Sequence, residues 1–129
     1  MAKVIGIGGV FFKAADTEKT KAWYVKNLGL QADEHGYVCL PWREKDSNRE
    51  HITVWSPFKE DTTHFAPSNK PYMINYVVDD LDGMLKQMRE AGATVDDKVQ
   101  AEEGYGRFGW AMDPDGTRIE LWEPAPPSE

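Results

Sequence analysis

An internal repeat constrains this chain more than any other feature. Asp80 lies 64 residues after Asp16, and each aspartate separates a strand-like apolar run from a helix-like stretch that a glycine ends, Gly29 in the first half and Gly92 in the second. An aspartate before such a stretch is typical of a helix N-cap, and a glycine after it is typical of the C-terminal end. The repeat therefore predicts two copies of one supersecondary module.

The first half predicts a strand, a helix and three short strands. Its first strand carries β-branched and aromatic residues around a Gly8-Gly9 pair, which favours extended structure. The expected elements are a strand over Val4–Ala14, a helix over Thr17–Leu28, and strands near Leu30–Asp33, Gly36–Arg43 and His51–Pro57.

The second half predicts the same order of elements. Its helix has a clear amphipathic stripe, because apolar residues recur at helical spacing at Leu81, Met84, Leu85, Met88 and Ala91. The segment Asp113–Gly116 is a strong signal for a hairpin turn. The expected strands are Tyr72–Val78 before the helix, and Ala93–Val99, Gly104–Met112 and Thr117–Glu123 after it.

Together the halves predict an α+β fold of two tandem βαβββ modules. One module alone would expose a sheet face and two edges, so we expect one cupped, mixed sheet with the helices on its convex face. Residues 1–129 then form a single domain, with module 1 over about 4–58, a linker over about 59–71 and module 2 over about 72–124. The polar stretch Pro57–Pro71 is either a plain linker or a flap over the cleft.

Charge and cysteine content exclude several classes of function. The chain has 15 basic and 22 acidic side chains and a formal charge of −7, so it lacks the basic face that a nucleic-acid-binding protein needs. No stretch is long and apolar enough to cross a bilayer, and the N-terminus has no signal-peptide pattern. Cys39 is the single cysteine, which favours a reducing, cytoplasmic location, and its apolar neighbours predict a buried thiol.

Three segments resemble the vicinal oxygen chelate superfamily, which includes glyoxalases, bleomycin resistance proteins and extradiol dioxygenases. They are the C-terminal Asp113–Pro124, the first helix with its aromatic pair and Leu-Gly turn over Asp16–Leu30, and the entry into the second helix at Val78–Asp82. The resemblance covers nearly the whole chain. It implies a ligand cleft on the concave side of the sheet, a homodimer, and, in the metalloenzymes, a divalent ion held by His or Glu side chains.

The family's four metal-ligand positions fall here on Gly9, Thr53, Met73 and Glu120. Only Glu120 is a good donor, because glycine has no side chain, threonine is a weak neutral donor and a thioether suits hard divalent ions poorly. We therefore predict no metal and no other cofactor. A rearranged site that pairs His51 with Glu120 is the alternative, although a histidine at the start of a strand favours a surface position.

Strand alternation predicts which side chains line the cleft. Burial among apolar walls predicts a raised pKa for Glu120 unless Arg107 or Arg118 offsets it, so Glu120 is the candidate catalytic residue, as a general base. A ligand anchor and a plain ion pair are the alternatives for it. His35 and His64 lie in turn-like segments and are expected to be solvated. The other expected cleft residues are Ile7, Phe11, Thr53, Trp55, Met73, Asn75, Arg107, Arg118 and Trp122.

Three functions remain open from the sequence. The first is a glyoxalase-like small-molecule-binding protein or enzyme of undefined substrate, with its ligand in the concave cleft and without the family metal. The second is a drug-sequestering protein of the bleomycin resistance type, because the acidic charge and Phe11, Trp55 and Trp122 suit a cationic aromatic compound. The third is a divalent-metal lyase or isomerase, similar to lactoylglutathione lyase, with a remodelled site. The expected partners are a small molecule and a second copy of the chain.

Overall fold

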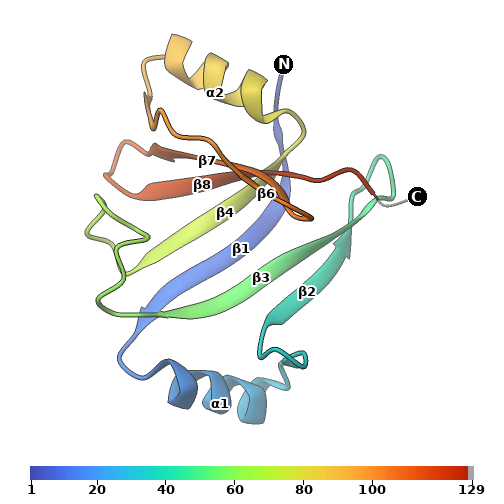
Figure 1. The fold of residues 1–129 in the computed structure, drawn as a ribbon, viewed down its shortest axis with the longest axis vertical. Helices are drawn as coiled ribbons and strands as arrows, with labels where there is room; N and C mark the ends of the chain where they lie inside the picture. Colours follow the sequence, from blue (N-terminus) through green and yellow to red (C-terminus); the bar gives the residue numbers. More distant parts are fainter. Residues whose placement is uncertain (128–129) are drawn as a thin grey trace.

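One open, mixed sheet of eight strands forms the body of the molecule (Figure 1). This computed structural model describes residues 1–127. The strand order is β2-β3-β1-β4-β8-β7-β5, and β6 pairs with β7. The elements are β1 (Val4–Ala14), α1 (Thr17–Leu28), β2 (Val38–Arg43), β3 (Glu50–Lys59), β4 (Tyr72–Val78), α2 (Leu81–Glu90), β5 (Thr94–Val95), β6 (Gln100–Glu102), β7 (Gly106–Met112) and β8 (Arg118–Pro124).

The two halves of the chain form equivalent units on either side of the sheet centre. The first strand of each half pairs in parallel with the last strand of the same half, β1 with β3 and β4 with β8. The antiparallel pairing of β1 with β4 joins the halves and runs from Val4 against Val78 to Phe12 against Tyr72. This arrangement confirms the predicted fold class, in which repeated modules share one sheet.

Both helices have the predicted caps. The carboxylate of Asp16 accepts a hydrogen bond from a backbone N–H of the first turn of α1 at 3.0 Å, and Asp80 does the same for α2 at 3.1 Å. Gly29 ends α1 with a φ of 70°, and Gly92 follows α2 with a φ of 88°, a conformation that costs other residues energy. Neither helix has the length and apolar character that a membrane span requires.

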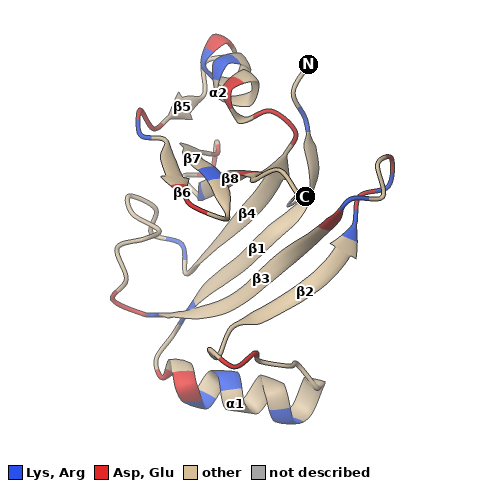
Figure 2. Ribbon diagram, turned by 45° about the vertical axis from the view of Figure 1, so that its right-hand side comes forward, with Lys and Arg blue, Asp and Glu red and all other residues tan. Residues whose placement is uncertain are grey.

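The helices lie outside the cup, at opposite ends of the sheet (Figure 1). Helix α1 packs against β1 and β3, and α2 packs against β5, β7 and β8. Charged residues gather on the helices, turns and strand ends, whereas the central strands carry few of them (Figure 2). The concave face is thus left free for a site with mainly apolar walls.

The short strands differ most from the sequence predictions. The segment Leu30–Asp33 contributes only a bridge between Ala32 and Val38, because Asp33 Oδ1 accepts hydrogen bonds from two backbone N–H groups and turns the chain early. The predicted strand Ala93–Val99 is reduced to β5. The short strand β6, which the sequence does not predict, pairs with β7 beside the concave face.

Two apolar clusters form the core. The cluster beneath α2 contains Val78, Leu81, Met84, Leu85 and Leu121. The cluster on the concave side contains Phe11, Phe65, Met73 and Trp110. Because Phe65 comes from the segment between β3 and β4, that segment is part of the core and not a plain linker.

Candidate functional site

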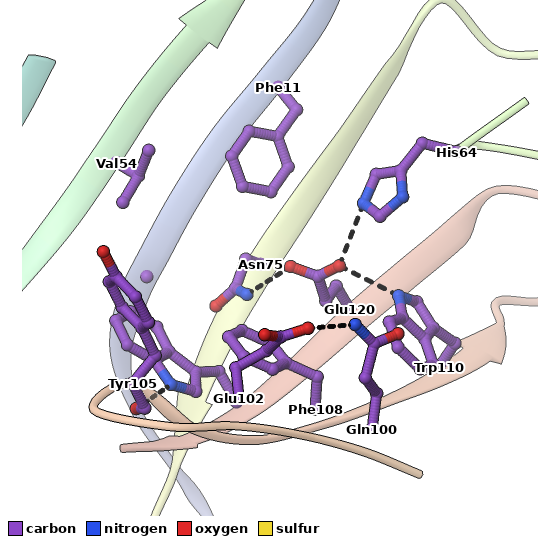
Figure 3. Close-up of a pocket in the computed structure, with 12 residues that line it drawn as sticks. Phe11, Val54, His64, Asn75, Gln100, Glu102, Tyr105, Phe108, Trp110 and Glu120 are labelled. Atoms are coloured by element: carbon purple, nitrogen blue, oxygen red, sulfur yellow. Dashed lines mark hydrogen bonds and ion pairs between the residues drawn. The ribbon is translucent and has the colours of Figure 1, made fainter. Parts of the chain in front are cut away.

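A cavity of about 280 Å³ lies on the concave face of the sheet (Figure 3). Its walls are mainly aromatic and apolar, with a few polar groups, which is the usual form of a small-molecule site. The lining residues are Gly8, Phe11, Val54, His64, Asn75, Gln100, Glu102, Tyr105, Phe108, Trp110, Glu120 and Trp122.

Strand register places Val54, Gly9, Asn75 and Glu120 in one row across the four central strands. Gly9 pairs with Val54 on β3 and with Asn75 on β4, and Asn75 pairs with Glu120 on β8. Three members of this row line the cavity. The polar groups of the row therefore come from the second half of the chain, while the first half supplies a glycine and a valine.

Glu120 is buried, and both of its carboxylate oxygens accept hydrogen bonds (Figure 3). Asn75 Nδ2 donates to Oε1 at 2.6 Å, while Trp110 Nε1 donates to Oε2 at 2.9 Å and His64 Nε2 lies 3.2 Å from the same oxygen. Burial raises the pKa of Glu120, but the hydrogen bonds from His64, Asn75 and Trp110 outweigh it and hold the pKa below its usual value. The predicted raised pKa is therefore wrong.

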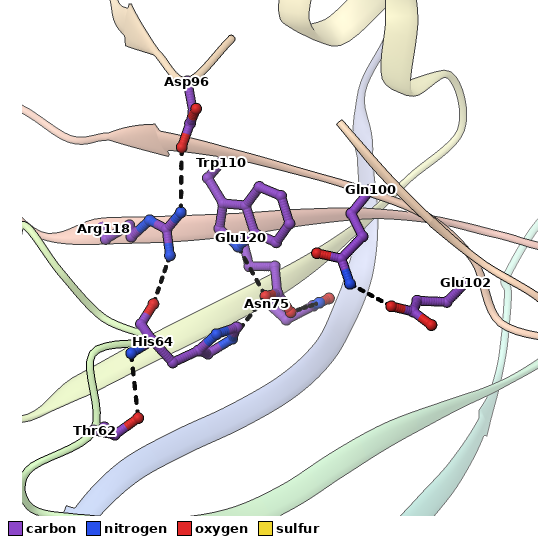
Figure 4. Close-up of polar contacts among 9 residues, drawn as sticks. All are labelled: Thr62, His64, Asn75, Asp96, Gln100, Glu102, Trp110, Arg118 and Glu120. Atoms are coloured by element: carbon purple, nitrogen blue, oxygen red, sulfur yellow. Dashed lines mark hydrogen bonds and ion pairs between the residues drawn. The ribbon is translucent and has the colours of Figure 1, made fainter. Parts of the chain in front are cut away.

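Within residues 1–127 no arginine pairs with Glu120, although the sequence predicted Arg107 or Arg118 as a partner. Arg118 Nη1 donates instead to the backbone carbonyl of His64 at 2.5 Å (Figure 4). Arg107 forms two hydrogen bonds with the carboxylate of Asp82 on α2, at 2.8 and 3.1 Å, and does not line the cavity. Neutral donors and His64 thus take the place that an arginine was expected to fill.

The segment between β3 and β4 contributes His64 to the cavity lining and brings it to Glu120 (Figure 4). His64 reaches Glu120, and its ring stacks on Phe58 with centroids 5.4 Å apart. The next residue, Phe65, is fully buried against Met73. Of the two alternatives for this segment, the structure favours the flap over the plain linker. His64 was predicted to be solvated; its side chain is 37% exposed, but its Nε2 is directed at Glu120.

On strand β3, the side chains that were predicted to face the cavity point to the other side of the sheet. Val54 lines the cavity, whereas Thr53 donates its hydroxyl to the carbonyl of Ile7 at 2.5 Å. Trp55 packs against Tyr24 of α1, with ring centroids 4.8 Å apart. The predictions that Thr53 and Trp55 line the cleft are wrong, because a shift of one residue exchanges the two faces of a strand.

Strand β1 pairs irregularly with β4 between Ile7 and Gly9. As a result Gly8 lines the cavity, and the predicted cleft residue Ile7 does not. A side chain at Gly8 would overlap Asn75 and Trp122, so the close approach of these residues to the backbone requires glycine.

The remaining predicted cleft residues lie on the concave side of the sheet. Phe11, Asn75 and Trp122 line the cavity. Met73 is fully buried under Phe65 and belongs to the core. Trp122 is held in place by a hydrogen bond from its Nε1 to a backbone carbonyl at 2.8 Å.

Two residues outside this cavity differ from the predicted burial. His51 is buried, with its Nε2 3.0 Å from a carboxylate oxygen of Glu44 and its ring stacked on Trp42, so the surface position predicted for it is wrong. Its partner is Glu44, not Glu120. Cys39 is exposed, contrary to prediction, because β2 is an edge strand of the sheet.

The sequence does not predict the wall that β7 contributes to the cavity. Phe108 lies opposite Trp122, and Trp110 lies opposite Glu120, in the antiparallel pair of β7 with β8. The turn at Asp113–Gly116 fixes the register of β7 against β8. Counting back from this turn would have predicted that Phe108 and Trp110 lie opposite the expected cleft residues Trp122 and Glu120.

Comparisons with known proteins identify the family. The sequence profile of the Glyoxalase/Bleomycin resistance protein/Dioxygenase superfamily matches residues 6–121. The chain belongs to this superfamily. No curated protein sequence matches it.

Several solved structures have the same fold as this superfamily member. Methylmalonyl-CoA epimerase from Mycobacterium tuberculosis is 21% identical, with 95% of this chain and 90% of that chain covered and a TM-score of 0.61. A variant of the epimerase from Streptomyces coelicolor, in complex with 2-nitronate-propionyl-CoA, is 15% identical, with 96% and 100% covered and a TM-score of 0.69. A hypothetical protein from Bacillus halodurans C-125 is 12% identical, with 99% and 98% covered and a TM-score of 0.63. These likenesses concern the fold.

The donors at the superfamily's metal-ligand positions do not fit a divalent ion. Gly9 has no side chain, Val54 and not Thr53 lines the cavity, and Met73 is fully buried in one cluster with Phe65. Glu120 already accepts three hydrogen bonds. Within residues 1–127, no group of three His, Cys, Asp or Glu side chains could hold a metal ion.

Proposed function

We propose that this protein binds a small organic molecule in the concave cavity without a metal ion of the superfamily type. The observation that carries the proposal is the environment of Glu120, which is buried beside aromatic side chains, accepts hydrogen bonds at both carboxylate oxygens and has a lowered pKa. Such a cavity offers apolar surface and hydrogen-bonding groups to a ligand, but no Lewis acid.

Glu120 is the centre of the proposed site. A carboxylate with a lowered pKa, whose two oxygens both accept hydrogen bonds from the protein, is a weak general base at neutral pH, so binding is better supported than base catalysis. We propose that Glu120 orients His64, Asn75 and Trp110 around the ligand. Asn75 Oδ1 is buried and has no hydrogen-bond partner among residues 1–127. Movement of Asn75 on ligand binding would allow this oxygen to accept a hydrogen bond from the ligand.

A second candidate function is sequestration of a cationic aromatic compound. The aromatic lining includes Tyr105, Phe108 and Trp122, and the carboxylates of Glu102 and Glu120 give this end of the site a negative charge. Aromatic faces bind cations that are shielded from water. This candidate differs from the first in the charge it requires of the ligand.

The test is a pair of fluorescence titrations, with neutral N-phenyl-1-naphthylamine and cationic ethidium as the probes. Val54→Trp would fill the cavity and should abolish binding of both probes, while Leu40→Trp adds the same side chain at an exposed position of β2 as a control. Tighter binding of ethidium than of the neutral probe would favour sequestration of cations. Unchanged binding of both probes to Val54→Trp would refute the proposed site.

Metal dependence needs a separate measurement. A ligand that binds only the folded state raises the melting temperature. Because we expect no metal ion to bind, Zn²⁺, Ni²⁺ or Mn²⁺ should leave the melting temperature unchanged, and EDTA added afterwards should have no effect. Stabilisation that EDTA reverses and Glu120→Ala removes would support the lyase or isomerase alternative instead.

We also propose that the protein is a homodimer. No residue of α1, which lies wholly in the described part of the chain, is buried, and the residues Trp23 and Leu28 are 57% and 62% exposed. Covering such side chains with a second copy would remove apolar surface from water. Light scattering at micromolar concentration should give twice the chain mass of 14.6 kDa, and a particle of the chain mass would refute the dimer.

A further inference from the structure

A second cavity, of about 720 Å³, continues the first one along β3. Tyr105 and Trp122 border both cavities. Ile52 borders the second cavity and Val54 the first, and residues two apart on a strand point to the same side of a sheet. The two cavities are therefore parts of one elongated site on the concave face.

Arg49 is the arginine of the second cavity. Its Nη2 donates to the backbone carbonyl of Ala125 at 2.5 Å, which holds the guanidinium beside the chain that leaves β8. Among residues 1–127 no carboxylate lies within 4.0 Å of it, whereas Arg43, Arg107 and Arg118 each pair with one. Arg49 thus has no salt-bridge partner in the described part of the chain; the pKa of Glu44 is lowered mainly by its hydrogen bond with His51 and only weakly by the nearby charge of Arg49.

The acidic groups around Arg49 are engaged elsewhere. Glu50 lines the same cavity, but its carboxylate lies 3.8 Å from Arg43. Glu44 is paired with His51 at 3.0 Å. Arg49 can therefore donate to an incoming anion, and a guanidinium binds carboxylates through two parallel hydrogen bonds.

We propose that the protein takes an elongated, amphipathic ligand, whose apolar end fills the Glu120 cavity and whose carboxylate binds Arg49. This inference rests on the proposed function of the first cavity. The volume of that cavity falls just short of the roughly 300–1,000 Å³ of common ligand sites, and the second cavity supplies the missing space. The ionised Glu120 would repel the carboxylate, so the charge distribution also sets the direction of the ligand.

The experiment compares two probes of the same shape, 6-(2-naphthyl)hexanoate and its neutral primary amide, by isothermal titration calorimetry. Wild-type protein should bind the carboxylate about tenfold more tightly than the amide, an advantage that salt reduces. Arg49→Gln should remove this advantage, so that the carboxylate and the amide bind with about the same affinity. Arg89→Gln is the matched control, because Arg89 also donates to a backbone carbonyl and lies on α2, away from the site.

The results distinguish failure of the proposed role of Arg49 from failure of the proposed function. Equal affinities for the two probes in wild-type protein, or an advantage that Arg49→Gln leaves intact, would overturn the role of Arg49. Val54→Trp should weaken binding of both probes, and if it does not, the first cavity is not the site and the proposed function fails. Cooperative thermal unfolding of each variant shows that it is folded.

Discussion

The two helices occupy equivalent places in the repeat and both have an aspartate N-cap, but they bury different amounts of apolar surface. Helix α2 buries Leu81, Met84 and Leu85, whereas α1 buries no residue and leaves Trp23 and Leu28 exposed. Most of the stability of a helix in a protein comes from packing of its apolar face. A repeated pattern thus determines the type of element at each place, but not how much that element stabilises the fold.

The cavity shows the same asymmetry. In the row across the central strands, the second half supplies Asn75 and Glu120, and the first half supplies Gly9 and Val54. The second half therefore carries the polar chemistry of the site, and the first half mainly shapes its apolar wall.

The largest expected difference between the halves concerns the buried face of α2. Leu81→Ala should lower the free energy of unfolding by about 2–5 kcal/mol, because Leu81 is fully buried and the substitution leaves a void. Urea unfolding followed by circular dichroism measures this change. A loss below about 1 kcal/mol would contradict the inference that packing of α2 stabilises the fold more than packing of α1 does.

A smaller loss is expected for Glu120→Gln, about 1–3 kcal/mol at neutral pH, because a buried, charge-assisted hydrogen-bond network is disturbed. The pKa of Glu120 is lowered in the folded state, so its carboxylate stabilises the fold above the unfolded pKa of about 4.3. This stabilisation is lost as the pH falls through the folded pKa. When unfolding is measured from pH 7 to pH 3, the free energies of unfolding of the variant and of wild type should converge as the pH falls. A difference between them that grows toward acid pH would refute the prediction.

The helix caps provide a more closely matched comparison. Asp80→Ala should cost about 1 kcal/mol of global stability, since the cap anchors a helix that is packed into the core. Asp16→Ala removes the same hydrogen bond from α1 but should chiefly speed hydrogen exchange in the first turn of that helix. Equal losses of global stability in the two variants would remove the distinction between the helices.

The smallest effect is expected on the exposed face of α1. Leu28→Ala should change the unfolding free energy of the isolated chain by no more than about 0.5 kcal/mol. In a homodimer that covers α1, the same substitution should instead weaken subunit association, which sedimentation velocity over a range of concentrations would detect. A large loss of stability in the monomer would show that α1 packs more tightly than its exposure indicates.

The elements with strong local signals could be predicted from the sequence. The bounds of β1, α1 and β4 agree with prediction, since a long apolar run or an Asp–Gly pair of caps marks each of them. The face of β3 could not be predicted, because Ile52 and Val54 are apolar on one side and Trp55 is apolar on the other. Both faces of this interior strand are covered, so alternation does not identify the cavity side.

The polar part of the site depends on contacts between distant segments. His64 lies in a polar stretch whose composition is typical of a solvated loop, and only the burial of Phe65 beside it brings the imidazole to Glu120. The irregular pairing that places Gly8 at the cavity depends on both β1 and β4. Glu120 itself could be located from the C-terminal motif, but the direction of its pKa shift depends on these partners.

The wall formed by His64 and Phe65 has a consequence for how such proteins diverge. Insertions and deletions in surface loops cost little free energy compared with changes inside a sheet. A change in the length of the segment between β3 and β4 would alter one wall of the cavity and leave every strand pairing intact. Ligand preference in this lineage could therefore change through loop exchange alone, whereas regaining a metal centre would require removal of Phe65 from above Met73 and new donors on three strands.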